Sequence, residues 1–518
     1  MEAYDPSTAE SAFHTSRTAF AALATRLADP AADRLADPAA DRLDHAALEE
    51  VVTTQGREVL RLLLQDHLDL RAVREREQQG RDRLPAPVDT HGTAHRAVET
   101  GHTRQLATVV GRVTIRRAAH RARGAANLYP ADAALNLPAG LHSFGVRRHC
   151  VQEAVRGSFD TAIAAVTTVC GPVVAKRQAR QLVRAAAADV AAFYTHATAA
   201  PPSTDATLLV LSFDSKGVPM LPEALREETR KKAEATGGGP YRTRLASGQK
   251  SARKRMAAIA AVYDAAPAVR RPHDVIQLAG AERAARRKGP KAQRKWLTAS
   301  LARPARQVIA EAFDRACERD PAHRRTWVVL VDGDNHQIEL IQAEARRRGA
   351  PIHLVVDFVH VAEYVWRAAW CFFCNGEPEA ERWVGIQLLG ILSGKLEETL
   401  AEIRQRAQRA KLTGDQVRGI TQCVRYLKAK KPFLDYTGAL AAGWPIATGI
   451  VEGACRHLIA DRMDITGARW GLEDAEAVLT LRAVHSNGDF QQYWGFHMRQ
   501  EYVRNHQARY QEGYHLTA

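Results

Sequence analysis

The sequence predicts an α/β core that is interrupted by an all-helical insertion and preceded by a mainly helical region with a β-hairpin. Four apolar runs read as buried strands: TLLVLSFD (207–214), MAAIAAVYD (256–264), TWVVLVDGD (326–334) and PIHLVVDF (351–358). Helical stretches separate these runs, and such alternation is typical of a mixed or parallel sheet. Residues 359–442 are mostly helical and break the pattern, which predicts the insertion.

The net positive charge points to a polyanionic partner. The chain has 73 Lys and Arg against 58 Asp and Glu, a formal net charge of +15 at pH 7, and its sequence pI is about 9.6. Nucleic acid is the leading candidate because neutralised phosphates release counterions. A membrane surface is the rival, but no apolar run approaches the roughly 20 residues that cross a bilayer.

The cysteines and the first residues predict a cytoplasmic protein. Seven cysteines are scattered along the 518 residues, and an odd, sparse set is typical of reduced thiols rather than of a disulfide framework. The N-terminal stretch MEAYDPSTAE is acidic and polar, unlike a secretory signal. The length allows about two to four domains.

The part before the first strand divides into a spacer and an N-terminal DNA-binding region. Residues 1–54 are Ala-rich, and the octapeptide LADPAADR at 27–34 is duplicated at 35–42, so we read them as a spacer in which Pro interrupts any helix. In the expected DNA-binding region, residues 55–198, alternating apolar residues in RQLATVVG and RVTIRRAAHR predict a hairpin with Gly111 between its strands.

Two helices in the same region resemble a helix-turn-helix. SFDTAIAAVTTVCG ends at a Gly171-Pro172 break, and AKRQARQLVRAAAADVAAFY continues at helical period. The second helix would carry Lys176, Arg177, Arg180 and Arg184, which we expect to contact DNA. An ordinary helical hairpin with a solvated basic face is the alternative.

Further boundaries follow changes in composition. Residues 199–206 (AAPPSTDA) read as a linker. We expect the first part of the core at 207–358, the helical insertion at 359–442, a final core segment with a helix at 443–498, and a tail at 499–518.

Two basic stretches lie between the predicted strands. Solvated helix faces explain most such runs, but two of them in a chain of this charge favour nucleic-acid contact. The first contains Lys250, Arg253, Lys254 and Arg255, and the second runs from Arg283 to Lys295.

Three acids stand out by position. Asp214 and Asp332 each follow an apolar strand, and Glu452 lies in the first turns of a helix after the insertion. Acids at strand ends face the crevice where α/β proteins place their sites, and two Mg²⁺ ions need several converging carboxylate oxygens. The alternative is that each acid is a turn residue or a helix cap.

Two further acids compete with Asp332. Asp334 follows it closely, and Asp357 also ends an apolar strand, three residues before His360. We prefer Asp332 because its strand is the better candidate to lie beside the first. Asp357 and His360 then read as residues that support the site or contact DNA.

Six stretches resemble ISKra-type bacterial insertion-sequence transposases. The longest, GWPIATGIVEGACRHLIADRMDITGARWGLEDAEAVLTLRAVHSNGDFQQYWGFH (443–497), resembles their C-terminal signature. The others are RGSFDTAIAAV, LSFDSKGVPMLPEALREETRK, KRMAAIAAVYD, RRTWVVLVDGDNHQ and VDFVHVAEYVWRAAW, in chain order. The resemblance covers roughly residues 55 to 510.

The resemblance implies a DDE transposase with an RNase H-like core split by a helical insertion, similar in plan to Mutator-like transposases. The catalytic acids and metal ligands would be Asp214, Asp332 and Glu452, with Mg²⁺, or Mn²⁺ in its place. Double-stranded DNA, as terminal inverted repeats and as target, would be the partner. Two departures are Ser215, where Gly is expected, and Ala460, where Lys is expected.

Other features carry less weight. Arg456, Arg462 and Arg469 could contact DNA beyond the Glu helix. Cys371 and Cys374 form a lone CxxC, which favours small core residues over a zinc site because zinc needs two more ligands. Joining two DNA ends predicts a dimer or larger assembly on DNA.

Two other functions stay open. A tyrosine-type recombinase would want an HxxR element, but the residue three after His457 is Ala460. A DNA-binding protein without catalysis, such as a decayed transposase, would keep the basic surfaces and lose the metal-dependent cleavage.

Overall fold

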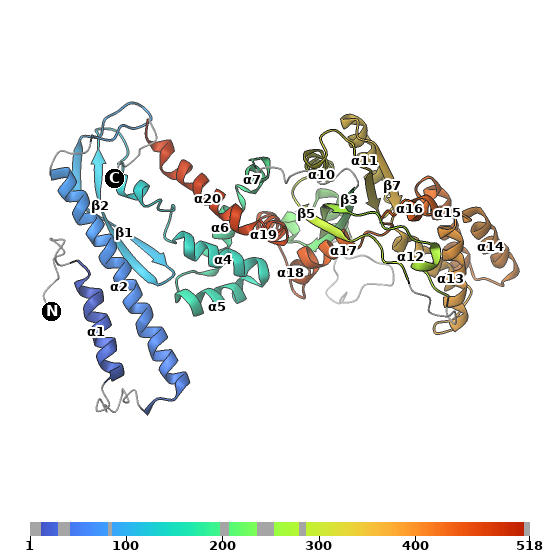
Figure 1. The fold of residues 1–518 in the computed structure, drawn as a ribbon, viewed down its shortest axis with the longest axis horizontal. Coiled ribbons are helices and arrows are strands. Elements are labelled where there is room, and N and C mark those ends of the chain that lie inside the picture. The colour runs from blue at the N-terminus through green and yellow to red at the C-terminus, as the bar shows by residue number, and fades with distance from the viewer. Residues whose placement is uncertain are drawn as a thin grey trace. The chain divides into compact units, whose positions relative to one another are not determined.

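The computed structural model describes residues 12–28, 42–80, 85–196, 207–235, 253–278 and 286–511. The chain splits into two compact units (Figure 1), one of residues 1–195 with 491–518 and one of residues 196–490. Of the described helices, none is both long and apolar enough to cross a membrane.

The first unit joins helices to a two-stranded hairpin. Its elements are α1 (His14–Ala28), α2 (His45–Gly80), β1 (Ala97–Thr108), β2 (Gly111–Arg121), α3 (Pro130–Ala134), α4 (Phe144–Arg156), α5 (Phe159–Cys170), α6 (Lys176–Ala187), α7 (Val190–His196), α20 (Phe490–Asn505) and the short η6 (Gln507–Arg509). The predicted hairpin is confirmed, because β1 and β2 pair antiparallel and Thr108 lies opposite Gly111. Helix α2 packs along β2.

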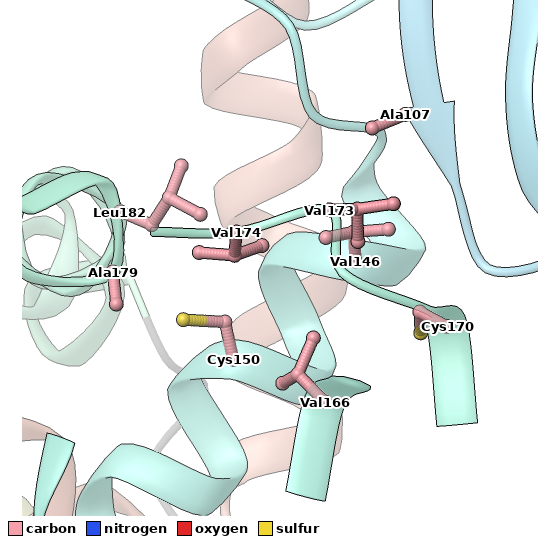
Figure 2. Packing of buried hydrophobic residues seen from close by; sticks show 9 residues of the cluster. All are labelled: Ala107, Val146, Cys150, Val166, Cys170, Val173, Val174, Ala179 and Leu182. Atoms are coloured by element: carbon pink, nitrogen blue, oxygen red, sulfur yellow. The ribbon is translucent and has the colours of Figure 1, made fainter. Parts of the chain in front are cut away.

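The predicted pair of helices around Gly171 is also confirmed. Helix α5 ends at Gly171, whose φ of +79° suits glycine, and α6 begins at Lys176. Figure 2 shows the small apolar core that joins these helices to α4, with Val146 and Cys150 facing Val166 and Ala179. Burying one face of α6 leaves Lys176, Arg177, Arg180 and Arg184 exposed.

The N-terminal spacer prediction is wrong for part of its length. Residues 14–28 form α1, which packs on α2, and the buried Ser16 donates its backbone N–H to Asp66 Oδ2 at 2.8 Å. Residues 45–54 are the start of α2. Most of the duplication, residues 29–41, lies outside the described residues.

The C-terminal helix differs from the expected boundaries at 498 and 499. Helix α20 belongs to the first unit from Gln491 onward, rather than to the core. The reason is a buried acid, Asp189, which bonds to His497 Nδ1 at 2.7 Å and accepts two hydrogen bonds from Arg504 at 2.6 and 2.8 Å. Unpaired, such a carboxylate would be costly to bury.

The second unit contains a mixed sheet and its covering helices. Its elements are β3 (Leu208–Pro219), η3 (Pro222–Ala224), α8 (Glu227–Ala235), β4 (Lys254–Ala265), α9 (Pro272–Val275), β5 (Ala292–Ser300), α10 (Ala305–Arg319), β6 (Trp327–Val331), α11 (Asn335–Arg348), β7 (Ile352–Val356), α12 (Phe358–Ala369), α13 (Pro378–Leu392), α14 (Leu396–Arg409), α15 (Gly414–Lys430), η4 (Lys431–Phe433), α16 (Tyr436–Ala441), α17 (Gly449–Ala454), the π-helix η5 (Cys455–Ala460), α18 (Asp461–Met463) and α19 (Leu472–Ser486).

The predicted α/β layer is confirmed. In the described part of this unit, five strands form one sheet in the order β5-β4-β3-β6-β7. Strand β3 pairs antiparallel with β4, which pairs antiparallel with β5, whereas β6 and β7 run parallel to β3. Helix α10 packs on β3, β4 and β5, and α19 packs on β5.

Part of each basic stretch between the predicted strands lies in a strand. Arg253 precedes β4, which begins at Lys254, and Lys295 lies in β5, which the sequence analysis missed. Gln293, Arg294 and Lys295 in the first half of β5 are exposed, and its second half, from Trp296 to Ser300, is buried. Lys250 and residues 279–285 lie outside the described residues.

A run of helices lies between β7 and α17, where the sequence predicts the insertion. Helices α12 to α16 occupy residues 358–441, and Figure 1 shows α13, α14 and α15 gathered at one end of the second unit. One anchor to the sheet is the fully buried Tyr436, whose hydroxyl donates to the Val356 carbonyl at 2.8 Å.

Candidate active site

The first predicted acid, Asp214, lies inside a strand rather than at its end. Strand β3 continues to Pro219, and Asp214 pairs with Ile259 of β4. The sequence analysis ended the strand too early because the polar stretch Ser215–Gly217 follows. Strand β4, the antiparallel partner, pairs with β3 as far as Pro219, whereas pairing with the parallel strand β6 ends at Ser212.

The register of β3 and β6 brings the first two acids together. Ser212 lies opposite Leu330 in this parallel pair. Asp332 directly follows β6, which ends at Val331, and continuing the register by two residues would set Asp332 opposite Asp214. Burial raises the pKa of the Asp214 carboxyl, and the nearby charge of Asp332 raises it further.

The third predicted acid, Glu452, is exposed on α17, which packs against β3 and β4. Cys455 lies one turn further along, and its buried thiol donates to Asp214 Oδ2 at 3.2 Å. Burial raises the pKa of this thiol, and the charges of Asp214 and Glu452 raise it further. Cys455 therefore links the element that carries Glu452 to the strand that carries Asp214.

A π-helix follows Glu452 directly. Residues Cys455–Ala460 take this rare form, which often marks functional positions in helices. Arg482 of α19 satisfies carbonyls there, because its Nε donates to the Leu458 carbonyl at 2.8 Å and its guanidinium also bonds to the His457 carbonyl. The irregular segment is thus fixed from outside.

The two competing acids are helix caps. Asp334 is exposed and accepts from Gln337 N at 2.8 Å at the start of α11. Asp357 is buried and accepts from Val359 N at 3.0 Å at the start of α12. It also accepts from Thr448 Oγ1 at 2.7 Å and Thr448 N at 3.3 Å. These bonds give Asp357 a structural role, because they join the start of α12 to Thr448, which precedes α17.

His360 lies among aromatic rings beside the acids. Its ring centroid is 5.7 Å from that of Tyr364 and 6.0 Å from that of Tyr426, and its Nδ1 lies 3.7 Å from Glu363. The Tyr426 hydroxyl in turn donates to the Asp332 carbonyl at 3.1 Å. His360 thus contacts the tyrosine whose hydroxyl bonds to the Asp332 carbonyl, and its role in the site stays a prediction.

The donor chemistry of the site suits a hard divalent cation. Asp214 and Asp332 offer carboxylate oxygens, the ligands that Mg²⁺ prefers, and like charges held close together favour a bridging cation. Within the described ranges, no three His, Cys, Asp or Glu side chains are grouped so as to hold a metal ion. Two acids thus fit the cation, and Glu452 would have to join them.

The cysteines proposed as weak zinc candidates lie in the insertion. Cys371 and Cys423 are buried and Cys374 is exposed. Cys371 Sγ donates to the Arg367 carbonyl at 3.3 Å. This is the environment of a small core residue.

Two of the arginines expected to contact DNA make contacts with other residues of this chain. Arg462 is buried over the Trp470 ring at 4.8 Å, and burial lowers its pKa to about 10. Arg255 Nε donates to the Leu301 carbonyl at 2.8 Å, and its Nη1 donates to Ala224 at 3.2 Å. Contacts with distant segments thus occupy both side chains, Arg462 being buried and Arg255 half-buried, and their contact with DNA stays a prediction.

Other expected contacts remain on the surface. Arg253 and Arg469 are exposed. Arg456 Nε lies 3.8 Å from Asp461, Lys254 Nζ lies 2.6 Å from Asp464, and Lys176 Nζ lies 2.7 Å from Asp160. Surface pairs of this kind are weak, so these cations can exchange partners.

Sequence reasoning missed Cys455, Thr448, Tyr426, Lys430 and Arg482. For Cys455 a signal existed, because a residue three positions after Glu452 shares its helix face. The contacts of the others span the chain and leave no local pattern.

A scan of protein-family models finds none that matches this chain, and a search of curated proteins finds no similar one.

The hydrogen bonds of Asp357 and Asp332 predict different losses of stability when each acid is replaced. Asp357→Ala should lower the free energy of unfolding by about 1–3 kcal/mol, because three buried donor groups lose their acceptor. Asp332→Ala should lower it by less than about 1 kcal/mol, since one partly exposed loop bond is lost. Urea unfolding of both variants makes the comparison, and equal losses would contradict the assignment.

Proposed function

We propose that this chain is a DNA transposase that cleaves and joins DNA strands by metal-dependent phosphoryl transfer. The observation that carries the proposal is the parallel register of β3 and β6, which ends with Ser212 opposite Leu330, two residues before Asp214 and Asp332. The charge of Asp332 acts on the Asp214 carboxyl, as expected of two acids that lie close together. Glu452 lies on a helix that packs against the strand of Asp214. These are the acids that the resemblance to insertion-sequence transposases also selects.

The strand order supports an RNase H-like core. Three antiparallel strands, β5, β4 and β3, are followed by two that run parallel to β3. The helical insertion separates this sheet from α17, which returns to pack on β3 and β4. A DDE transposase of this plan has its third acid after the insertion, and Glu452 occupies that position.

The chemistry we propose is an in-line displacement at phosphorus. Asp214, Asp332 and Glu452 would hold divalent cations, which supply Lewis acidity to the attacking and leaving oxygens. In cleavage, a water oxygen forms a bond to phosphorus while the bond to the 3′ oxygen breaks, and that oxygen leaves as a hydroxyl. In joining, the oxygen of this 3′-hydroxyl forms a bond to a phosphorus of the target strand while the bond from that phosphorus to the target's own 3′ oxygen breaks, and the target 3′ oxygen leaves as a hydroxyl. No covalent protein–DNA intermediate is needed.

The first unit would bind the ends of the element. The exposed face of α6 carries Lys176, Arg177, Arg180 and Arg184, and phosphate contacts of Lys and Arg supply much of DNA affinity. The net charge of +15 favours the same partner. Because two ends must be joined, we expect at least a dimer on DNA.

The burial of two C-terminal tyrosines counts against the tyrosine recombinase alternative, whereas Tyr502 of α20 is half-buried and does not. Such an enzyme needs an accessible tyrosine, and Tyr493 of α20 is buried with its hydroxyl bonded to the Ala186 carbonyl. Tyr510 is buried as well.

Cleavage of the element's own end DNA tests the proposal. The full chain should cut that DNA with Mg²⁺ and not with EDTA, and Glu452→Gln should slow cutting by at least about 1,000-fold because one carboxylate of the site is lost. Glu339→Gln, an exposed change on α11, is the matched control and should cut normally.

Two outcomes would contradict this function. Cutting that survives EDTA would exclude the metal-dependent mechanism. Specific binding with no cutting would favour the non-catalytic DNA-binding alternative.

Salt dependence tests the α6 face. Arg180→Ala should weaken binding of end DNA and reduce the slope of log Kd against log salt by about 1, because one phosphate contact is lost. Arg418→Ala is the control, since this exposed arginine lies in the insertion and pairs with Asp415. Equal slopes for Arg180→Ala and the unaltered protein would remove α6 from the interface.

A further inference from the structure

We propose that helix α15 of the insertion positions the second acid, Asp332, through Tyr426 and Lys430. The proposal rests on the proposed function, because it gives the insertion a task in that same site. The two residues are four positions apart, so they lie on one face of α15, one turn from each other.

The first contact is between Tyr426 and the loop after β6. Its hydroxyl donates to the Asp332 carbonyl at 3.1 Å. The next residue, Gly333, has a φ of +97°, and a Cβ there would lie 2.6 Å from the same hydroxyl oxygen. Only glycine allows this approach and this backbone conformation, so loop and helix are fitted to each other.

The second contact is between Lys430 and the start of α11. Its ammonium group donates to Asn335 Oδ1, and the side chain is buried. The negative charges of Asp332 and Asp334 act on this ammonium group. A buried lysine needs such partners, so the contact holds α15 on the loop that carries the acid.

The ring of Tyr426 is itself held in place. It stacks on Tyr364 of α12 with centroids 3.8 Å apart and planes 7° from parallel. This stack fixes the direction of the hydroxyl without using it. Two helices of the insertion, α12 and α15, therefore fix the orientation in which the Tyr426 hydroxyl bonds to the Asp332 carbonyl.

The loop transmits this restraint to the carboxylate. Asp332 Oδ1 accepts from the backbone N–H of Asp334 at 2.9 Å, so the side chain and the loop backbone turn together. Tyr426 restrains the carbonyl of the same residue. Tyr426 and Lys430 are positioning residues, and their loss should let the carboxylate move away from Asp214.

The test compares two tyrosines that each donate to a main-chain carbonyl at the end of a strand. Tyr426→Phe removes the hydroxyl that reaches Asp332, and Tyr436→Phe removes the one that reaches Val356. Binding of Mn²⁺ is measured on the full chain by the electron paramagnetic resonance of free manganese. Cleavage of end DNA is followed in single turnovers.

Tyr426→Phe should weaken Mn²⁺ binding and slow cleavage by about 10-fold each, the usual effect of losing an outer-shell partner. Lys430→Gln should act in the same direction. Tyr436→Phe should lower the melting temperature, because a fully buried carbonyl loses its donor. At temperatures where it is folded, its Mn²⁺ binding and cleavage should match those of the unaltered protein.

The remaining outcomes contradict either the positioning role of Tyr426 and Lys430 or the proposed function itself. If the unaltered protein binds Mn²⁺ and cleaves while Tyr426→Phe and Lys430→Gln do both equally well, the inference fails alone. It also fails if Tyr436→Phe weakens Mn²⁺ binding as much as Tyr426→Phe does, because the effect is then a general loosening. If the unaltered protein neither binds Mn²⁺ nor cleaves, the proposed function fails and the inference fails with it.

Discussion

Residues Leu209–Ser212 of β3 pair in parallel with Trp327–Leu330 of β6, and this register determines where Asp214 and Asp332 lie. The pairing is buried at every one of these positions. A slip by one residue would turn the side chains of one strand to the opposite face. The apolar core therefore keeps the two acids near each other, although neither acid contributes to that core.

Residues far apart in the chain complete the site. Thr448 is bound by the buried Asp357 and accepts the backbone N–H of Glu452 at 3.0 Å, so the end of β7 supports the start of α17. Cys455 joins that helix to Asp214, and Tyr426 joins the insertion to Asp332. In the sequence, the insertion thus lies between Asp332 and Glu452. In the fold, its helix α15 contacts the loop that carries Asp332.

Much of this arrangement could be predicted from the sequence. Period and composition located four of the five strands described in the larger sheet, the hairpin, the helices between β7 and α17, and the helix of Glu452. Strand β5 was missed because basic residues fill its exposed half. The contacts of Arg462 with Trp470 and of Arg255 with Leu301 could not be predicted, because folding brings these partners together. Tertiary contacts of this kind have no signature in one sequence.

The central claim is that Asp214 and Asp332 form one cation site. Crystals of the full chain soaked in Mn²⁺ test it most directly, through anomalous scattering from manganese. The account predicts an anomalous peak in contact with carboxylate oxygens of both residues, on the side of the sheet where α17 carries Glu452. A chain that binds manganese only elsewhere, with these two carboxylates left apart, would contradict it.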